Sequence, residues 1–380
     1  MAPLAIVAGY LAGNPVGGHV LSILHWLAGL RALGYDVVFA EHHGWPDACW
    51  NPVTSTLSDD PSYGLHELQT HADAIGFRWC FVDAAGTHHG LSKAEMGRLC
   101  RQADVMLGLW TVTWLEEFTD CRRRIFIDTD PGFTQFGMSP EVTARAGFAS
   151  PMDFHEHYSY GTRIGSPDCP IPTHGIDWRP LRPPVALPLV PVQFTPDAPC
   201  FTTVMKWSPR QPLIYDGEEY GQKDVEFWRI ATLPSRVASC LEIALGGAAP
   251  YDAMREAGWQ LADAARVTAT PWTYRDYIGQ SRGEFSVAVN LEVKTRSGWF
   301  SDRTAAYLAS GKPVVVQDTG FSEDLPCGEG LFAFRTIDDA AAAIEEINRD
   351  YRRHSLAARR IAEQHLDANR ILRRVINGEH

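Results

Sequence analysis

The stretch KTRSGWFSDRTAAYLASGKPVVVQDTGF, from Lys294 to Phe321, predicts a loop, a helix, a buried strand and a second loop. Ser301 can accept a backbone N–H bond as the N-cap of the helix, and Gly311 ends the helix where a left-handed residue is least costly. Pro313 opens a run of three valines, which is too short and too apolar for anything but a buried parallel strand. The stretch therefore predicts one half-unit of a parallel α/β sheet.

Basic side chains gather where this helix begins. In an open parallel sheet, ligands bind at the carboxyl ends of the strands, and a helix N-terminus facing that edge offers N–H groups and positive potential to phosphate. We therefore expect a diphosphate site here, with an ordinary solvated basic rim as the alternative for any single cation. The candidate diphosphate-binding residues of the stretch are Lys294, Arg296, Ser301, Asp302, Arg303, Thr319 and Gly320.

The sequence GKPVVVQDTGFSEDLPCGEGL, residues 311–331, resembles the donor half of GT-B type nucleotide-sugar glycosyltransferases, and in particular the glycosyl transferases group 1 family. The resemblance is clear over residues 285–347 and looser elsewhere. It implies an α/β fold with two Rossmann-like parallel-sheet domains facing each other across a cleft. It also implies a nucleotide-diphosphate sugar as co-substrate, with no bound cofactor or metal.

The chain departs from this family at one point. Retaining members carry a pair of glutamates before the Gly-x-Pro, and the matching positions here are Gly298 and Ala306. The departure favours an inverting over a retaining mechanism and leaves the donor-binding role in place.

Length and composition exclude several classes of protein. The 380 residues suffice for two domains with separate cores, and 45% hydrophobic with 21% charged residues is typical of a soluble globular protein. The net charge of -12 and the lack of a basic run argue against a nucleic-acid partner. No apolar segment approaches the roughly 18 residues of a membrane span. The eight cysteines show no paired spacing, so we expect reduced thiols and a cytoplasmic protein.

The N-terminus predicts a βαβ unit. A strand over Leu4–Gly9 precedes a glycine-rich loop, a helix over Gly18–Leu33 and a strand over Asp36–Glu41. A right-handed crossover makes this pair of strands parallel. The loop lacks G-x-G-x-x-G, which argues against a dinucleotide bound there.

A proline-rich segment separates two such regions. Ten prolines fall within residues 167–199, a density incompatible with a regular helix or a central strand. The expected domains are an acceptor domain (1–166), a linker (167–199), a donor domain (200–366) and a terminal helix (367–380). That helix could cross back to the first domain or simply end the second. The sequence is silent on oligomeric state.

Further elements complete both regions. A helix is expected near Pro140–Ala146 in the first region and near Asp224–Thr232 in the second. Strands of the second region are expected near Phe201–Lys206, Cys240–Leu245, Arg266–Ala269, Phe285–Val289, Val314–Gln317 and Leu331–Phe334.

His19 is the candidate catalytic base. It follows Gly17 and Gly18 at the start of the first helix, and inverting GT-B enzymes that act on small molecules carry a histidine after a similar strand and loop. A base near the acceptor hydroxyl is what an inverting transfer needs. The alternative is a histidine that only closes the loop by hydrogen bonding.

A carboxylate should orient this histidine, and Asp104, Asp128 and Asp130 all stand at strand ends. Asp128 and Asp130 also form a D-x-D, the metal–diphosphate signature of the other glycosyltransferase architecture. A D-x-D is a weak signal, and we favour an acceptor-side or structural role without metal.

Aromatic and basic residues complete the candidate site. Aromatic residues in the loops of the first domain suit a small hydrophobic acceptor. The acceptor candidates are Gly17, Gly18, Trp110, Trp114 and Phe133. The family resemblance implies a basic pair on the phosphates, and the matching residues of the second domain are Lys206 and Lys223, with Arg210 as a weaker third. The family pattern suggests Trp272 for the nucleobase and Glu323 for ribose or sugar hydroxyls, unless Glu323 caps the short helix after Gly320.

The leading hypothesis is therefore a nucleotide-sugar glycosyltransferase acting on a small, hydrophobic or aromatic acceptor, as in the tailoring of natural products in secondary metabolism. A sugar-nucleotide 2-epimerase of the same fold and a Rossmann-type oxidoreductase are the alternatives. A sugar-nucleotide-binding protein without catalysis also stays open, because a fold does not settle activity.

Overall fold

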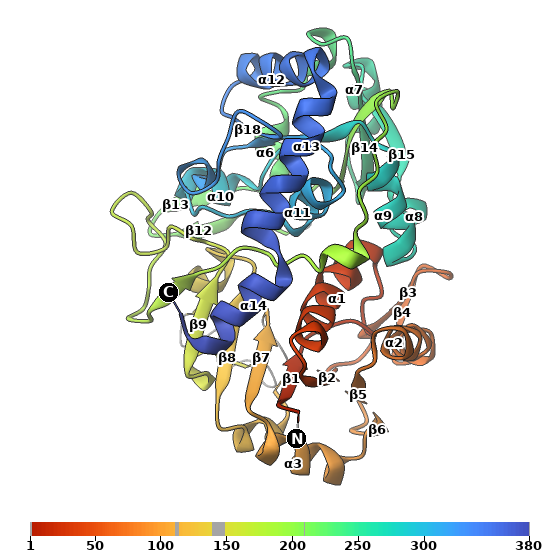
Figure 1. Ribbon diagram of the computed structural model, residues 1–380, viewed down its shortest axis with the longest axis vertical. Helices are drawn as coiled ribbons and strands as arrows, with labels where there is room; N and C mark the ends of the chain where they lie inside the picture. The colour runs from red at the N-terminus through yellow and green to blue at the C-terminus, as the bar shows by residue number, and fades with distance from the viewer. Residues whose placement is uncertain (1, 111–113, 139–148, 209, 380) are drawn as a thin grey trace. The chain divides into compact units, whose positions relative to one another are not determined.

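The computed structural model describes residues 2–110, 114–138, 149–208 and 210–379. Contacts divide the chain into two compact units (Figure 1). Unit 1 comprises Met1–Gly161, Pro172–Ala186 and Ala368–His380, and unit 2 comprises Thr162–Ile171 and Leu187–Asp367. The chain therefore passes between the units several times, whereas the sequence suggested one linker. The functional boundaries of the acceptor and donor domains stay predictions.

Unit 1 is built on a sheet of eight strands within the described residues, in the order β10-β9-β8-β7-β1-β2-β5-β6. All neighbours are parallel except β5 and β6. The strands are β1 (Leu4–Ala8), β2 (Asp36–His42), β5 (Arg78–Val82), β6 (His88–Gly90), β7 (Val105–Leu109), β8 (Arg124–Asp128), β9 (Glu156–Ser159) and β10 (Trp178–Pro180). A separate antiparallel pair consists of β3 (Cys49–Asn51) and β4 (Thr56–Ser58).

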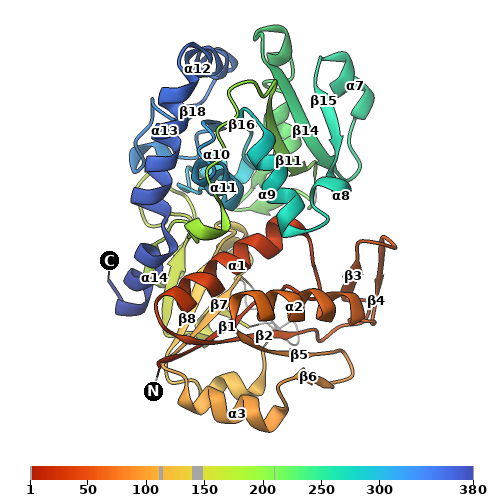
Figure 2. The same ribbon diagram turned by 45° about the vertical axis from the view of Figure 1, so that its right-hand side comes forward.

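Helices accompany the sheet of unit 1. Figure 2 shows α1 and α2 side by side along it. The helices are α1 (Gly17–Ala32), α2 (Ser62–Ile75), α3 (Lys93–Gln102), α4 (Phe133–Phe136) and α14 (Ala368–Asn377). The helix expected near residues 140–146 lies outside the described residues.

The terminal helix α14 packs against α1 within unit 1. A Cβ on Gly29 of α1 would lie 2.4 Å from Cδ1 of Leu372, so only glycine permits this close approach. Arg123 donates to the carbonyls of Val375 (3.2 Å) and Ile376 at the C-terminal end of the helix. The last helix is thus fixed at both its side and its end.

His25 ties another returning segment to α1. It is 2% exposed, and its Nδ1 accepts a hydrogen bond from the backbone N–H of Ala186 (3.2 Å). Burial lowers the pKa of His25 to about 3, so the ring is neutral in the folded protein.

This histidine makes unit 1 acid-sensitive. In the unfolded chain this histidine is protonated below its ordinary pKa of 6.5. In the folded protein the buried ring is protonated only when the pH falls to about 3. The free energy of unfolding should therefore fall by about 1.4 kcal/mol per pH unit below pH ~6.5. Urea unfolding at pH 7.5 and pH 5 should show a smaller loss in His25→Gln than in the wild type. An equal loss in both proteins would contradict this assignment.

Unit 2 is built on a sheet of six strands, counted over the described residues, in the order β15-β14-β11-β16-β17-β18. All five neighbouring pairs are parallel. The strands are β11 (Cys200–Lys206), β14 (Cys240–Gly246), β15 (Gln260–Asp263), β16 (Gly283–Ser286), β17 (Val314–Gln317) and β18 (Leu331–Phe334). The expected fold class, α/β with two Rossmann-like parallel sheets, is confirmed.

The connections of unit 2 are mostly helical (Figures 1 and 2). The helices are α6 (Lys223–Phe227), α7 (Tyr251–Glu256), α8 (Ala264–Val267), α9 (Pro271–Gln280), α10 (Asn290–Thr295), α11 (Asp302–Ala309), α12 (Ile337–Arg349) and α13 (Tyr351–Ile361). A hairpin pairs β12 (Leu213–Tyr215) with β13 (Glu218–Tyr220).

The strand expected at Arg266–Ala269 is wrong. The strand is β15, which ends at Asp263, and the following residues form α8. The side chain of Asp263 accepts from the backbone N–H of Ala265 (2.9 Å) and caps this helix. Because Asp263 caps a helix at this point, the strand lies earlier in the chain than expected.

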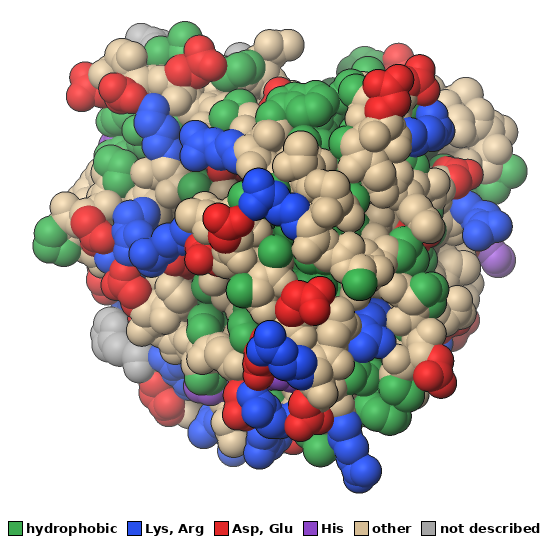
Figure 3. Space-filling view, turned by 90° about the horizontal axis from the view of Figure 1, so that it is seen from above, with side chains coloured by type: hydrophobic (Ala, Val, Ile, Leu, Met, Phe, Trp, Pro, Cys, Tyr) green, Lys and Arg blue, Asp and Glu red, His purple; other side chains and the backbone are tan. Residues whose placement is uncertain are grey.

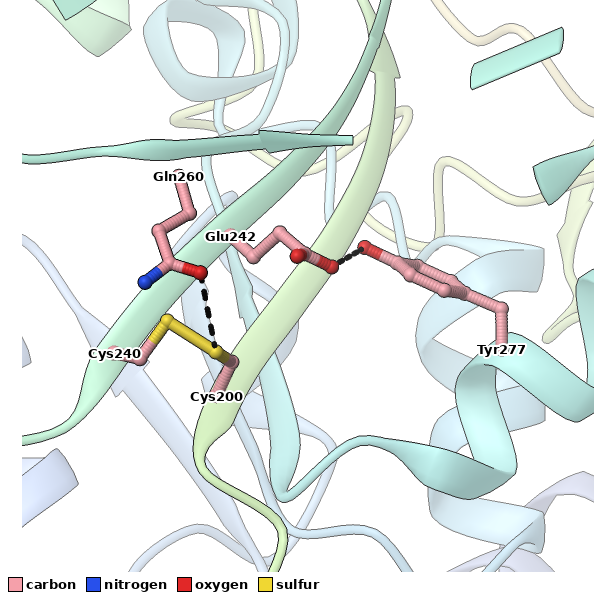
Figure 4. The surroundings of a disulfide bond; sticks show 5 residues. All are labelled: Cys200, Cys240, Glu242, Gln260 and Tyr277. Carbon is pink, nitrogen blue, oxygen red and sulfur yellow. Dashed lines mark hydrogen bonds between the residues drawn. A yellow bond between two sulfur atoms is a disulfide. The ribbon is translucent and has the colours of Figure 1, made fainter. Parts of the chain in front are cut away.

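A disulfide joins Cys200 and Cys240, which are directly paired residues at the start of β11 and β14 (Figure 4). The expectation that all eight cysteines are free thiols is therefore wrong for this pair. Sequence spacing could not show it, because the two cysteines are 40 residues apart and meet only through strand register.

The disulfide should contribute to the stability of unit 2. Closing a loop of this length restricts the unfolded chain, and disulfides of this kind contribute about 2–4 kcal/mol. Addition of a dithiol reductant should lower the melting temperature of the wild type to that of the Cys200→Ala, Cys240→Ala double variant, which the reductant should not affect. A wild-type melting temperature that is unchanged by reductant would contradict the prediction.

Candidate functional site

The carboxyl ends of the unit 2 strands form the candidate site. β11, β16 and β17 end at Lys206, Ser286 and Gln317, and α11 begins at the same edge. A small pocket, with room for about one water molecule, lies there between the strand ends and the helix. It is lined by Ser286, Val287, Ala288, Trp299, Phe300, Ser301, Arg303, Thr304, Val316, Gln317, Thr319 and Phe321.

The N-terminus of α11 forms one wall of this pocket. Ser301 is its N-cap, with its hydroxyl accepting from the backbone N–H of Arg303 (3.2 Å). The loop before the helix is joined to the loop after β17, because Gly298 N–H donates to Thr319 O (2.8 Å) and the Thr319 hydroxyl donates to Trp299 O (2.6 Å). The first turn of α11, with the positive end of its helix dipole, is thus held beside the pocket by a fixed pair of loops.

A buried carboxylate supports the opposite wall. Glu226 of α6 is 1% exposed and accepts from Asn290 (2.6 Å) and Gln317 (2.5 Å). The oxygen of the Gln317 amide accepts from Ala288 N–H (3.1 Å) in the pocket wall. Glu226 lies 91 residues from Gln317, so no local pattern could have indicated its role.

The structure brings three predicted donor residues together at the pocket, namely Ser301, Arg303 and Thr319. Asp302 and Gly320 are their immediate chain neighbours. Sequence reasoning missed Ser286, Ala288, Trp299 and Thr304, of which Trp299 and Thr304 lie inside the stretch from Lys294 to Phe321 without a recognisable motif.

Arg303 bonds inward from the pocket wall. Its Nε donates to Glu284 (2.6 Å) and its other nitrogens donate to Ser286 Oγ (2.6 Å) and Val204 O (2.9 Å). Burial lowers the pKa of Arg303, and the charge of Glu284 more than offsets this and raises it. The guanidinium thus contributes positive potential at the helix start while joining the two strands β11 and β16.

The other two cations predicted at the diphosphate site pair elsewhere. Lys294 contacts Glu218 (2.6 Å) and the carbonyl of Glu219 (3.0 Å). Arg296 contacts Glu323 and Asp168 (3.1 Å). Neither cation lines the pocket, so the cluster expected from sequence is divided among three sets of carboxylates.

Lys206 differs from these cations. It is exposed at the carboxyl end of β11 and forms no ion pair with any residue that the structure describes. Lys223 begins α6. Trp272 is the second residue of α9, and the Arg275 guanidinium lies 5.1 Å from its ring centre. Lys206, Lys223, Arg210 and Trp272 are outside the pocket lining, and their roles stay predictions.

The loop after β1 in unit 1 is organised by Glu41, which the sequence analysis missed. This carboxylate is 2% exposed and accepts the backbone N–H groups of Leu11, Ala12 and Gly13, each at 2.8 Å. It also contacts Nε2 of His43 (2.6 Å). Glu41 therefore accepts the hydrogen bonds of three backbone amides and fixes the conformation of the glycine loop.

His19 lies at the end of this loop. Its Nε2 hydrogen-bonds the carbonyl of Tyr10, and its ring stacks on Trp110 at 4.7 Å between centres. A carbonyl can only accept, so Nε2 carries a hydrogen and Nδ1 is the basic nitrogen of the neutral ring. Trp110 has a positive φ of 63°, a strained conformation that typically marks a functional constraint.

The carboxylates expected to orient His19 have other partners. Asp128 is fully buried and accepts from Thr134 (2.6 Å), Gln135 (2.8 Å) and Ser159 (2.6 Å). Burial raises the pKa of Asp128, and these hydrogen bonds oppose the increase. Asp130 donates its backbone N–H to Asp128 (3.2 Å). Catalytic roles for both stay predictions, while the contacts show Asp128 anchoring the loop into α4.

Asp104 is wrong as the orienting group. Its carboxylate accepts from Leu4 N–H (2.7 Å) at the amino ends of β1 and β7, the opposite edge of the sheet from the His19 loop.

The acceptor candidates differ in their surroundings. Gly17 and Gly18 start α1, and Phe133 starts α4 half-buried. Trp114 packs edge-on against Phe118 (5.7 Å) and Phe154 (5.9 Å). The ring of Trp110 is in stacking contact with that of His19.

Among the described residues, no group of three or more His, Cys, Asp or Glu side chains is arranged to hold a metal ion. No helix in the described ranges combines the length and apolarity required to cross a bilayer.

Comparison with known proteins finds similarity in structure but not in sequence family. No family model matches the sequence, and a search of curated proteins finds no match. Among solved structures, an alpha-glucosyltransferase in complex with UDP and a 13-mer DNA containing an HMU base is similar with a TM-score of 0.57 and 11% identity, over 99% of both chains. HepE from Anabaena in complex with UDP-glucose is similar with a TM-score of 0.57 and 13% identity, over 99% of this chain and 98% of that chain. These likenesses show that the fold is GT-B, as the resemblance implied.

Proposed function

We propose that this protein is a glycosyltransferase that uses a nucleotide-diphosphate sugar, with UDP as the nucleotide. The observation that carries the proposal is the start of α11 at the carboxyl edge of the unit 2 sheet, where a helix N-terminus offers positive potential to a diphosphate. The fold supports it, because the two similar structures with this fold contain UDP or UDP-glucose.

The donor half of the reaction rests on unit 2. The first turn of α11 and Lys206 would stabilise the negative charge that develops on the diphosphate as its bond to the sugar breaks. The reaction as proposed needs no cofactor and no metal, since N–H groups and cations supply the required potential.

The acceptor half rests on unit 1. His19 would take the proton of the acceptor hydroxyl on Nδ1 while the hydroxyl oxygen forms a bond to the anomeric carbon and the diphosphate leaves. This is an inverting displacement. The ring of Trp110 beside His19 favours a small hydrophobic or aromatic acceptor, as in the tailoring of secondary metabolites.

A nucleic acid is a second candidate for the acceptor, because one similar structure was solved with DNA. The face in Figure 3 carries Lys and Arg side chains interspersed with Asp and Glu, and the chain has a net charge of -12. The net charge favours a small-molecule acceptor over a polyanion.

The test is an assay of UDP release from UDP-glucose with a panel of phenolic, aliphatic and DNA acceptors, with product masses recorded. We expect a glycosylated small molecule together with UDP. Conversion of a UDP-sugar to its 2-epimer without acceptor would favour the epimerase, and oxidation coupled to NAD(P) would favour the oxidoreductase. Either result without any sugar transfer would contradict the proposal.

A further inference from the structure

Four charged side chains of unit 2 form a closed ring of ion pairs. Arg163 contacts Asp168 (2.5 Å) and Glu323, and Arg296 contacts Glu323 and Asp168 (3.1 Å). Each guanidinium therefore binds both carboxylates. We call this set the Arg163 ring, and sequence reasoning had found only Arg296 and Glu323 of its members.

The Arg163 ring is built on the loops that line the pocket. A Cβ on Gly320 would lie 2.7 Å from Cδ of Arg163, and one on Gly298 would lie 2.9 Å from its Cγ. Both glycines have positive φ, so both the backbone conformation and the space require glycine. The chain neighbours of these glycines line the pocket. Trp299 follows Gly298 on one loop, and Thr319 precedes Gly320 on the other.

The Arg163 ring has one unused hydrogen-bond donor, and its two carboxylates are accessible to solvent. Nε of Arg163 is buried and has no hydrogen-bond partner among the residues that the structure describes. The Arg163 side chain is 12% exposed, whereas Asp168 and Glu323 are 47% and 44% exposed. Arg296 is held at a positive φ of 49°, which is unfavourable for a residue with a side chain. An unused guanidinium donor beside solvent-accessible carboxylates is an arrangement that an incoming anion can improve.

We propose that the Arg163 ring is the ligand-free form of the diphosphate site, in which Asp168 and Glu323 occupy the places that phosphate oxygens take when the nucleotide binds. Guanidinium groups bind carboxylate and phosphate with the same planar fork, so one can replace the other. The inference rests on the proposed function and assigns Arg163 as a further donor-binding residue.

The inference reverses the expected role of Glu323. A glutamate that binds ribose or sugar hydroxyls would strengthen nucleotide binding, and its removal would weaken it. A glutamate that competes with the diphosphate for Arg163 and Arg296 would weaken binding, and its removal would strengthen it. The sign of one substitution therefore separates the two roles.

The experiment is calorimetric titration with UDP and with uridine of the wild type and three variants. Arg163→Gln should bind UDP about tenfold or more weakly, because a charge-assisted contact is lost. Glu323→Gln keeps the shape of the side chain and should bind UDP severalfold more tightly. Arg236→Gln is the matched control, because it removes an exposed ion pair of the same unit, with Asp338. Uridine lacks phosphate and should show none of these differences.

The possible results separate a failure of this inference from a failure of the proposed function. Weaker UDP binding by Glu323→Gln, or wild-type affinity in Arg163→Gln, would overturn the inference while the proposed function stands. A wild type that binds no UDP would overturn both. Melting curves identify any variant that fails to fold. If Arg163→Gln fails to fold, Glu323→Gln alone decides by its sign.

Discussion

Replacement of Arg303 by leucine is expected to destabilise unit 2 by about 3–5 kcal/mol, because it leaves the carboxylate of Glu284 buried without a counter-charge. Glu284 is 0% exposed, and its second oxygen has no hydrogen-bond partner among the described residues. Ser286 and the carbonyl of Val204 lose their donor in the same variant. Urea unfolding measures the loss directly.

A second substitution tests the cause. In the double variant Arg303→Leu, Glu284→Leu the buried charge is also removed, and most of the lost stability should return, since apolar replacement of a whole buried ion pair is often neutral. Arg236→Leu breaks the exposed pair with Asp338 and should cost less than about 1 kcal/mol. If Arg303→Leu is as mild as Arg236→Leu, then Arg303 does not hold the strands together.

Replacement of His19 by alanine is expected to reduce transfer by about 10²–10⁴-fold, the usual contribution of a general base, while UDP binding is unchanged. The donor pocket belongs to unit 2 and His19 to unit 1, so loss of the imidazole leaves every lining residue of the pocket in place. Steady-state rates of transfer and calorimetric UDP affinity separate the two effects.

His19→Gln is the matched control for the loop-closing role. A glutamine can still donate to the Tyr10 carbonyl, as Nε2 of His19 does, but it has no basic nitrogen. The base hypothesis expects the glutamine variant to be as slow as the alanine variant. Full activity in His19→Gln with loss in His19→Ala would show that the histidine only closes the loop.

Local sequence patterns predicted the fold well. The N-cap at Ser301, the glycine that ends α11 and the valine strand all stand where the stretch from Lys294 to Phe321 placed them. These features depend on residues within a few positions of each other, such as capping hydrogen bonds and apolar period. The same kind of reasoning failed where Asp263 caps α8, because a short helix there interrupts an apolar run.

Long-range partners could not be predicted. Glu41 was known only as the end of a strand, yet its carboxylate holds the loop near residues 11–13. Lys294 and Arg296 were grouped by their closeness in sequence, but the fold pairs Lys294 with Glu218, 76 residues away, and Arg296 with Asp168, 128 residues away, as well as with Glu323. A charged side chain shows its type in sequence, but the partner that decides its function comes from the tertiary fold.

The central claim is that the N-terminus of α11 binds a diphosphate, and one pair of variants tests it most directly. Asp and Asn stabilise a helix N-cap about equally well and have nearly the same shape. The variants Ser301→Asp and Ser301→Asn therefore differ mainly in one negative charge at the pocket wall. Calorimetric titration with UDP should therefore show Ser301→Asn close to the wild type and Ser301→Asp at least about tenfold weaker, because the carboxylate repels the diphosphate. Equal UDP affinity in the two variants would contradict the claim.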